Sequence, residues 1–240
     1  MQWVLVLIGL LGTTGATVTG LYRGALAAGL PKRTATSVAA VAGSAWTAWM
    51  VVSAVLAASD VYRQSPDKFE PWIAVGVVVP FLVVVAASRI PVAQRILRAP
   101  GAAARLMWPQ SFRVVGATFL IAWALGELPA IFALPAGLGD VAVGISAVFV
   151  ARRGVRSVSF NVLGLLDLVV AVSIGFLAGL GPARLLAVEP STLYVSLLPL
   201  VLIPTVAVPL VAALHVIALR QRVDSRVTRS TQEVKADSRR

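Results

Sequence analysis

The chain has 240 residues, of which 58% are hydrophobic and only 13% charged, and its mean hydropathy is +0.89. Soluble domains carry about a quarter charged residues, so this composition excludes an ordinary soluble domain and predicts an all-α bundle of transmembrane helices. The net charge of +11 does not indicate nucleic acid as a partner, because the basic residues lie between apolar runs and in the tail. The absence of cysteine excludes disulfides, thiolate metal sites and cysteine nucleophiles.

Seven apolar runs follow one another along the chain. They cover about residues 3–22, 35–58, 72–88, 111–126, 136–151, 160–179 and 192–219. A spanning helix needs roughly 20 residues, so the fourth and fifth runs are short and borrow flanking residues. Barrel strands would alternate polar and apolar positions, which these runs do not. The sequence therefore predicts a polytopic seven-helix domain over residues 1–219 and a basic, disordered cytoplasmic tail over residues 220–240.

The basic residues indicate the orientation of these helices. With the N-terminus outside, 18 of the 21 lysines and arginines fall in cytoplasmic segments, and only Arg63, Lys68 and Arg184 fall outside. Removing one helix would invert every later loop and abolish this bias. We therefore expect a cytoplasmic C-terminus and a multi-pass location in the plasma (inner) membrane. The expected partners are the lipid bilayer and anionic lipid headgroups on its cytoplasmic side.

Prolines mark three irregular segments. The stretch 89–110 is either an interfacial amphipathic helix or a plain basic loop. The apolar segment 126–139 is broken by two prolines, which predicts a bend or a short interfacial helix at the outer surface. The last run, 192–219, carries three prolines five residues apart, and each is expected to kink or loosen the final helix.

Five polar residues are the candidate substrate- or proton-binding residues, because polar groups inside membranes are rare and commonly functional. They are Arg113, Asp140, Asn161, Asp167 and His215. The neighbours of both aspartates on their helix faces are glycine and alanine, which lets helices approach closely, so both should face the bundle interior. The helical rise places Asp167 and His215 in one inner layer, together with Arg113 under one interpretation, and Asp140 roughly 6 Å further out.

Two interpretations of these residues stay open. They form a polar pocket or proton path across the bundle, or they are structural. In the structural case the carboxyls are protonated and bind neighbouring helices, Asp167 and His215 form a pair, and Arg113 extends to the inner headgroups. His215 is the only histidine, too few for a zinc site or a bis-histidine haem, so we expect neither a metal nor a cofactor.

Three stretches carry a resemblance to known sequences. They are Leu134 to Asp140 (LPAGLGD), Asn161 to Asp167 (NVLGLLD), and Ile203 to Pro209 (IPTVAVP) followed by His215. Together they resemble a family of uncharacterised bacterial multi-pass membrane proteins, over about residues 112–219. The resemblance implies the fold and the membrane location but no activity.

Three function classes stay open, and the sequence favours the first. It is a proton-linked transporter of a small solute or ion. The second is a membrane-embedded enzyme acting on a lipid, with Asp167 and His215 within hydrogen-bond reach; the absence of P-loop, GxSxG, HExxH and dinucleotide motifs argues against an enzyme. The third is a scaffold subunit or homo-oligomer, which would expose small residues of the first helix to lipid, namely Gly12, Ala16, Gly20 and Gly24.

Overall fold

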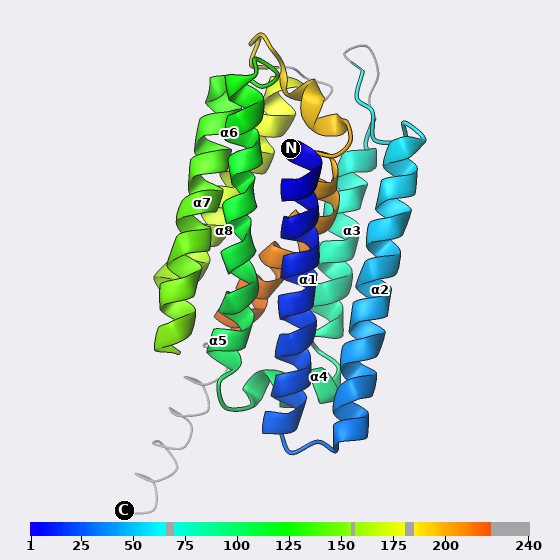
Figure 1. Cartoon of the computed structure of the whole chain (residues 1–240), viewed down its shortest axis with the longest axis vertical. Helices are drawn as coiled ribbons and strands as arrows, with labels where there is room; N and C mark the ends of the chain where they lie inside the picture. The colour runs from blue at the N-terminus through cyan, green and yellow to red at the C-terminus, as the bar shows by residue number, and fades with distance from the viewer. Residues whose placement is uncertain (66–69, 155–156, 181–184, 222–240) are drawn as a thin grey trace, which may run out of the picture.

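The structure, a computed structural model, describes residues 1–65, 70–154, 157–180 and 185–221. Within these ranges the fold is an all-α bundle without β-strands (Figure 1). Five helices are long and apolar enough to cross a membrane: α1 (Gln2–Ala27), α2 (Lys32–Ala58), α7 (Ala130–Arg153), α8 (Val158–Gly175, continued by turns to Gly179) and the C-terminal helix (Ile203–Gln221). A sixth candidate is α3 (Trp72–Ala87) taken together with α4 (Pro91–Arg98), which bends away from it by 80°.

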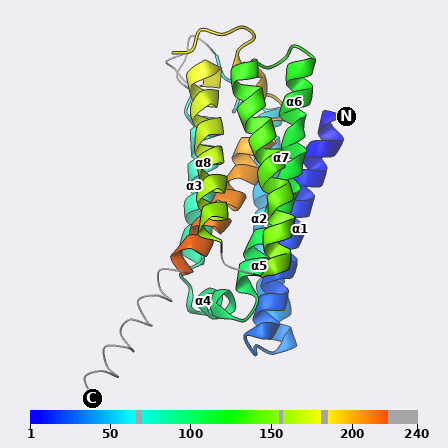
Figure 2. The same cartoon turned by 90° about the vertical axis from the view of Figure 1, so that its left-hand side faces the viewer.

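The helices surround the C-terminal helix. In Figure 1 α1 lies at the front and Figure 2 shows it at one edge of the bundle, while in both views the C-terminal helix slants through the middle. In the most apolar stretch of the C-terminal helix 56% of the residues are buried, whereas in that of α2 only 11% are. Thr205 and His215 on the C-terminal helix therefore lie inside the bundle and not at its surface.

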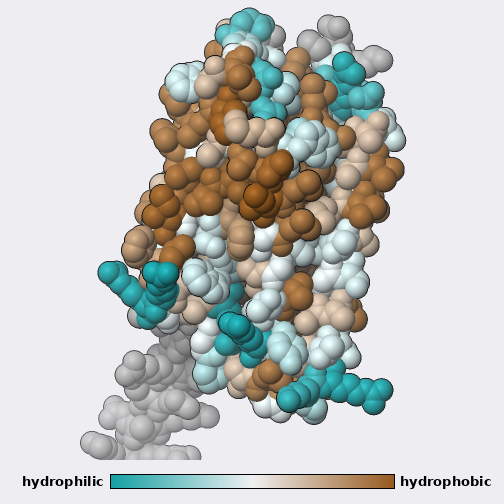
Figure 3. Space-filling view, viewed as in Figure 1, coloured by the Kyte–Doolittle hydropathy of each residue, from teal (hydrophilic) through white to brown (hydrophobic). Residues whose placement is uncertain are grey.

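The surface of the bundle is apolar where lipid would touch it. Figure 3 shows hydrophobic side chains over the upper and middle part of one face and hydrophilic side chains gathered at the two ends. Large exposed side chains include Val79, Leu82 and Val83 on α3 and Leu163 and Leu166 on α8. Water-exposed surfaces rarely carry contiguous apolar patches of this kind. The structure is therefore that of a membrane protein.

The fourth helical run is longer than the predicted 111–126. The elements α5 (Ala102–Met107), η1 (Trp108–Gly116, a 3₁₀ helix) and α6 (Ala117–Ala124) follow one another without a gap. Their combined rise is roughly 39 Å, because a 3₁₀ helix rises about 2.0 Å per residue. Of the two interpretations of stretch 89–110, the amphipathic helix forms over α4, which starts with Pro91 in its first turn, where proline is best tolerated.

The predicted irregular segment 126–139 is confined to its first residues. The chain turns at Gly126 to Pro129, and helix α7 begins at Ala130 and continues through Pro135 to Arg153, so the break expected at Pro135 is wrong. Pro135 lies in the second helical turn, so it removes a single backbone hydrogen bond close to a helix end. The long apolar sequence that follows stabilises the remaining turns. The fifth span is therefore 24 residues long, because it takes in flanking residues on both sides of the predicted 136–151, as expected.

The last helix does not cover the predicted 192–219. A short 3₁₀ helix, η3 (Thr192–Ser196), is followed by extended backbone at Leu197, and the C-terminal helix begins only at Ile203, with the π-turn η4 (Ile203–Ala207). Proline lacks an N–H group and disfavours a helical conformation in the residue before it, so Pro199 ends up outside the helix. The predicted disorder of the tail concerns residues 222–240, which lie outside the described residues.

Candidate functional site

A buried arginine lies where four helical elements meet. Arg113 belongs to η1 and is only 5% exposed. Its Nε donates to Asp140 Oδ1 on α7 at 2.7 Å, and its Nη2 donates to Asp167 Oδ2 on α8. Its Nη1 donates to the carbonyl oxygen of Gly164 at 3.2 Å. The guanidinium therefore does not extend to the inner headgroups, and that interpretation of Arg113 is wrong.

The single histidine completes the surroundings of the guanidinium. His215 on the C-terminal helix is fully buried, and its Nε2 lies 3.3 Å from Arg113 Nη1. Arginine has no acceptor atom, so Nε2 must accept and the proton of the neutral ring must be on Nδ1. That proton is donated to Asn161 Oδ1 at 2.9 Å. Both ring nitrogens of His215 are thus engaged.

Local structure at the start of α8 holds the Asn161 side chain. The Ser157 hydroxyl accepts the backbone N–H of Phe160 at 3.2 Å and so caps the helix. One turn in, the Asn161 amide donates to the Ser157 carbonyl oxygen at 2.7 Å. This bond leaves the amide oxygen to face His215. The two hydrogen bonds together set the orientation of Asn161.

Three glycines make room for the polar side chains. A Cβ atom at Gly116 would overlap the side chain of Asp140, and one at Gly139 would overlap that of Asp167. A Cβ atom at Gly164 would overlap the His215 ring. Gly164 was visible in the sequence as a small neighbour on the Asp167 face. Gly116 and Gly139 were missed, because each serves a side chain on another helix.

All five residues predicted from the sequence are therefore joined in one hydrogen-bonded group, the Arg113 cluster (Arg113, Asp140, Asn161, Asp167 and His215). Asp140, which was expected to lie further out than Asp167, binds the same guanidinium as Asp167. With both carboxylates ionised and the histidine neutral, the cluster carries one cation and two anions. Each carboxylate side chain is only 15% exposed.

Two small cavities adjoin the cluster at Asp140. One has a volume of about 40 Å³ and opens among apolar side chains such as Phe119 and Phe132. The other, of about 30 Å³, lies between α1, η1 and the C-terminal helix and is also lined by Arg113. A cavity holds a water molecule when its volume exceeds about 10–15 Å³. Each has room for water beside Asp140, and neither has room for a larger solute.

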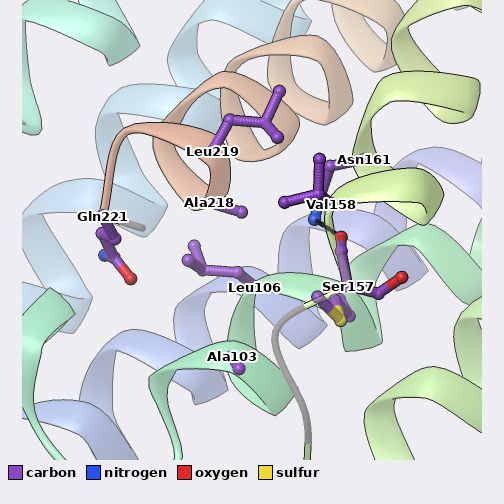
Figure 4. A pocket seen from close by; sticks show the side chains of 9 residues that line it. Ala103, Leu106, Ser157, Val158, Asn161, Ala218, Leu219 and Gln221 are labelled. Atoms are coloured by element: carbon purple, nitrogen blue, oxygen red, sulfur yellow. Dashed lines mark hydrogen bonds between the residues drawn. The ribbon is translucent and has the colours of Figure 1, made fainter. Parts of the chain in front are cut away.

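A third cavity lies at the other end of the cluster. It has a volume of about 10 Å³ and is lined by Asn161 and Ser157, with Leu106, Ala218 and Leu219 across from them (Figure 4). Asn161 thus has one side against His215 and the other against this cavity. Among the described residues no three His, Asp or Glu side chains are grouped as a metal site would require.

A comparison with protein-family models gives one match. The model described as a domain of unknown function, DUF8737, matches residues 70–222. The matched part is more than half of the chain and contains the whole Arg113 cluster. The chain belongs to this family. The DUF8737 span runs from just before α3 to the end of the C-terminal helix and leaves out α1 and α2. No curated protein and no solved structure matches the chain.

Proposed function

We propose that the protein is a proton-linked transporter of a small solute or ion, and that the Arg113 cluster is its proton-binding site. One observation carries the proposal: two aspartates share a single buried guanidinium inside an apolar helical bundle. Ionisable residues in such surroundings are costly, and they commonly mark ion pathways and proton relays. The family match gives no activity, so the argument rests on this cluster.

The charge balance of the cluster supports a proton site. With Asp140 and Asp167 both ionised, one negative charge is left without a counter-ion in a medium of low polarity. Uncompensated buried charge is unfavourable, and such groups tend to become neutral. One added proton on either carboxyl makes the cluster neutral and leaves an ion pair with Arg113. The cluster therefore has two states that differ by one proton, as proton coupling requires.

The two cavities at Asp140 support a route for that proton. Each has room for a water molecule, which would reach the Asp140 carboxyl directly. The cavity at Asn161, of about 10 Å³, is too small to extend that route to the other end of the cluster. The solute itself needs a wider opening than these cavities provide. In this proposal the present conformation is a closed one, and solute entry requires the helices to separate.

We also propose that the chain crosses the plasma (inner) membrane seven times, with the N-terminus outside. The five long helices and α3 supply six crossings, and the run from α5 to α6 is the seventh. The described acidic residues outside the cluster lie in the connections at one end of the bundle, while the described basic residues other than Arg63 and Arg113 lie near the other. This asymmetry supports a cytoplasmic face at the basic end. The choice of membrane rests on the resemblance to bacterial multi-pass proteins.

Two observations disfavour the alternative functions. Asp167 and His215 do not bond to each other; both bind Arg113, and His215 has no free ring nitrogen to act as a base. The glycine face of α1 is not turned to lipid, since a Cβ atom at Gly12 would overlap Phe112 and one at Gly24 would press on Ile96. The lipid-facing small-residue patch expected of a scaffold subunit is therefore occupied from within the chain.

Uptake into proteoliposomes tests the proposal. Vesicles with a trapped pH indicator would be given a panel of alkali cations, amino acids and sugars, with and without an inward proton gradient. We expect gradient-driven uptake of one class, accompanied by a change in internal pH, and its loss in Asp140→Asn and Asp167→Asn. The matched control is Glu127→Gln, the same chemical change at the end of the bundle, where Glu127 accepts from Gln2. Unchanged coupling in both aspartate variants would refute the mechanism.

A further inference from the structure

A wide depression lies at the basic end of the bundle, away from the Arg113 cluster. Helix α4 turns by 80° from α3 and crosses this end of the molecule beside the end of α1 (Figure 1). Between them is a cavity of about 510 Å³. Its walls include Ala27 and Ala28 from α1 and Gln94, Arg95 and Arg98 from α4. Small-molecule sites commonly measure about 300–1,000 Å³, so the depression is large enough for a headgroup-sized ligand.

The Arg95 side chain is oriented for binding. Its Nε donates to the carbonyl oxygen of Ala28 at 3.2 Å, which ties the guanidinium to the end of α1. In the part of the chain that the structure describes, the two Nη groups of Arg95 have no hydrogen-bond acceptor. They are the atoms that bind two oxygens of one phosphate in a fork arrangement. The Arg95 side chain is therefore held in place by its Nε, while its two Nη groups bond to no acceptor among the described residues.

The opposite wall is held by a second arginine. Arg105 Nη1 donates to the carbonyl oxygen of Pro100, and Nη2 donates to that of Ala99 at 3.2 Å. Ala99 and Pro100 also line the depression. Gly101 follows with φ of 76°, a conformation that favours glycine. These contacts fix the turn after α4, so Arg98 at the end of that helix keeps its place in the wall.

The charge around the depression is of one sign. Arg23 lies near the end of α1, and Lys32 and Arg33 begin α2 at the same end of the bundle. All acidic side chains within the described ranges belong either to the opposite end of the bundle or to the Arg113 cluster. The described charges around the depression therefore attract an anion. Phosphate suits the planar, doubly donating guanidinium better than a monodentate anion does.

We propose that this depression binds a phosphate-bearing anion, held between Arg95 and Arg98. The phosphate belongs either to the headgroup of a membrane lipid or to a soluble phosphate compound. The amphipathic helix α4 lies across the end of the bundle at the level where headgroups would meet the protein. The proposal does not depend on transport, and it holds or fails separately from the role of the Arg113 cluster.

Binding to the full-length protein in phosphatidylcholine nanodiscs tests the site. The lipid arm adds spin-labelled phosphatidylglycerol and measures its immobilised fraction; the soluble arm titrates inorganic phosphate and glycerol 3-phosphate by calorimetry. We expect Arg95→Gln/Arg98→Gln to weaken binding in one arm by about tenfold, the loss typical of charge-assisted hydrogen bonds. The matched control is Arg152→Gln/Arg153→Gln, which removes the same charge from exposed positions at the same end on α7.

A second pair of variants leaves the arginines in place. Ala27 is exposed at the edge of the depression, so Ala27→Glu adds a carboxylate there with little risk to folding, and Ala27→Gln is its neutral control. Ala27→Glu should weaken binding, while Ala27→Gln should not. A response in the lipid arm alone identifies a headgroup, and one in the soluble arm alone identifies a free phosphate. No binding in either arm, or equal losses in the arginine pair and its control, would overturn the proposal.

Discussion

Neutralising both aspartates of the Arg113 cluster should be much more destabilising than neutralising each one separately. In Asp140→Asn or Asp167→Asn, the guanidinium keeps one carboxylate, and the amide oxygen replaces the lost acceptor at similar shape. The cluster is then electrically neutral. In the double variant Asp140→Asn/Asp167→Asn, Arg113 keeps its charge, 5% exposed, with no counter-ion among its contacts.

The expected losses of unfolding free energy differ between the single variants, which keep one carboxylate on Arg113, and the double variant, which keeps none. Each single variant should lower the free energy of unfolding by about 1 kcal/mol, the size of one interhelical hydrogen bond in a membrane bundle. The double variant should lower it by about 3–5 kcal/mol, the penalty for a buried charge that has lost its partner. The difference between the double variant and the sum of the singles is then about 1–3 kcal/mol, well above the scatter of about 0.5 kcal/mol for independent sites.

The assay is reversible unfolding in mixed micelles, with helix content followed by circular dichroism as sodium dodecyl sulfate is added. A matched cycle pairs Asp140→Asn with Glu127→Gln. Glu127 accepts from Gln2 Nε2 at 3.0 Å at the far end of the bundle and shares no partner with Asp140, so these two changes should be additive. Additivity in the Asp140 and Asp167 cycle as well would refute the idea that both carboxylates neutralise one buried guanidinium.

Two further predictions concern His215. Gly164→Ala should lower the free energy of unfolding by about 1–3 kcal/mol, the usual penalty for overpacking, because the added Cβ would overlap the His215 ring. Gly15→Ala on α1 is the control. A Cβ atom there meets nothing within 4 Å, so this change should be neutral or slightly stabilising. Because the chain has one histidine, ¹⁵N-histidine labelling gives a single ring, and its shifts should report a proton on Nδ1 and a bare Nε2 facing Arg113. A proton on Nε2 would contradict the hydrogen bond that this nitrogen accepts from Arg113, which fixes the tautomer.

The membership of the cluster was predictable from the sequence, but its geometry was not. Charged residues in apolar runs, next to faces of glycine and alanine, are enough to nominate Asp140 and Asp167. Their meeting at Arg113 joins residues 27 and 54 positions apart, which no local pattern encodes. Nor does the sequence pattern reveal that Arg113 lies in a 3₁₀ segment, where the rise per residue is longer than in an α-helix.

Proline was a good signal of irregular structure and a poor guide to its kind. Pro135 sits near the start of α7 and leaves the helix intact, whereas Pro199 lies in the turns between η3 and the C-terminal helix. The difference depends on what surrounds each residue. Pro135 is followed by eighteen helical residues that pack against η1 and α8, while Pro199 has another proline five residues later. Sequence reasoning sees the missing N–H group but not the packing that compensates for it.

Helix α1 supports the cluster although it lies outside the DUF8737 span. Cβ atoms at Gly9 and Gly12 would overlap Val115 and Phe112, so η1 packs tightly into the glycine face of α1. Phe112 and Val115 are three residues apart, one turn of a 3₁₀ helix, and therefore lie on the same face. Arg113 is turned away from that face toward α7 and α8. The tight turn thus lets one short segment direct an apolar ridge to α1 and a cation to the aspartates. Because η1 is held on both sides, a movement of η1 would change both the bonds of Arg113 and the packing against α1.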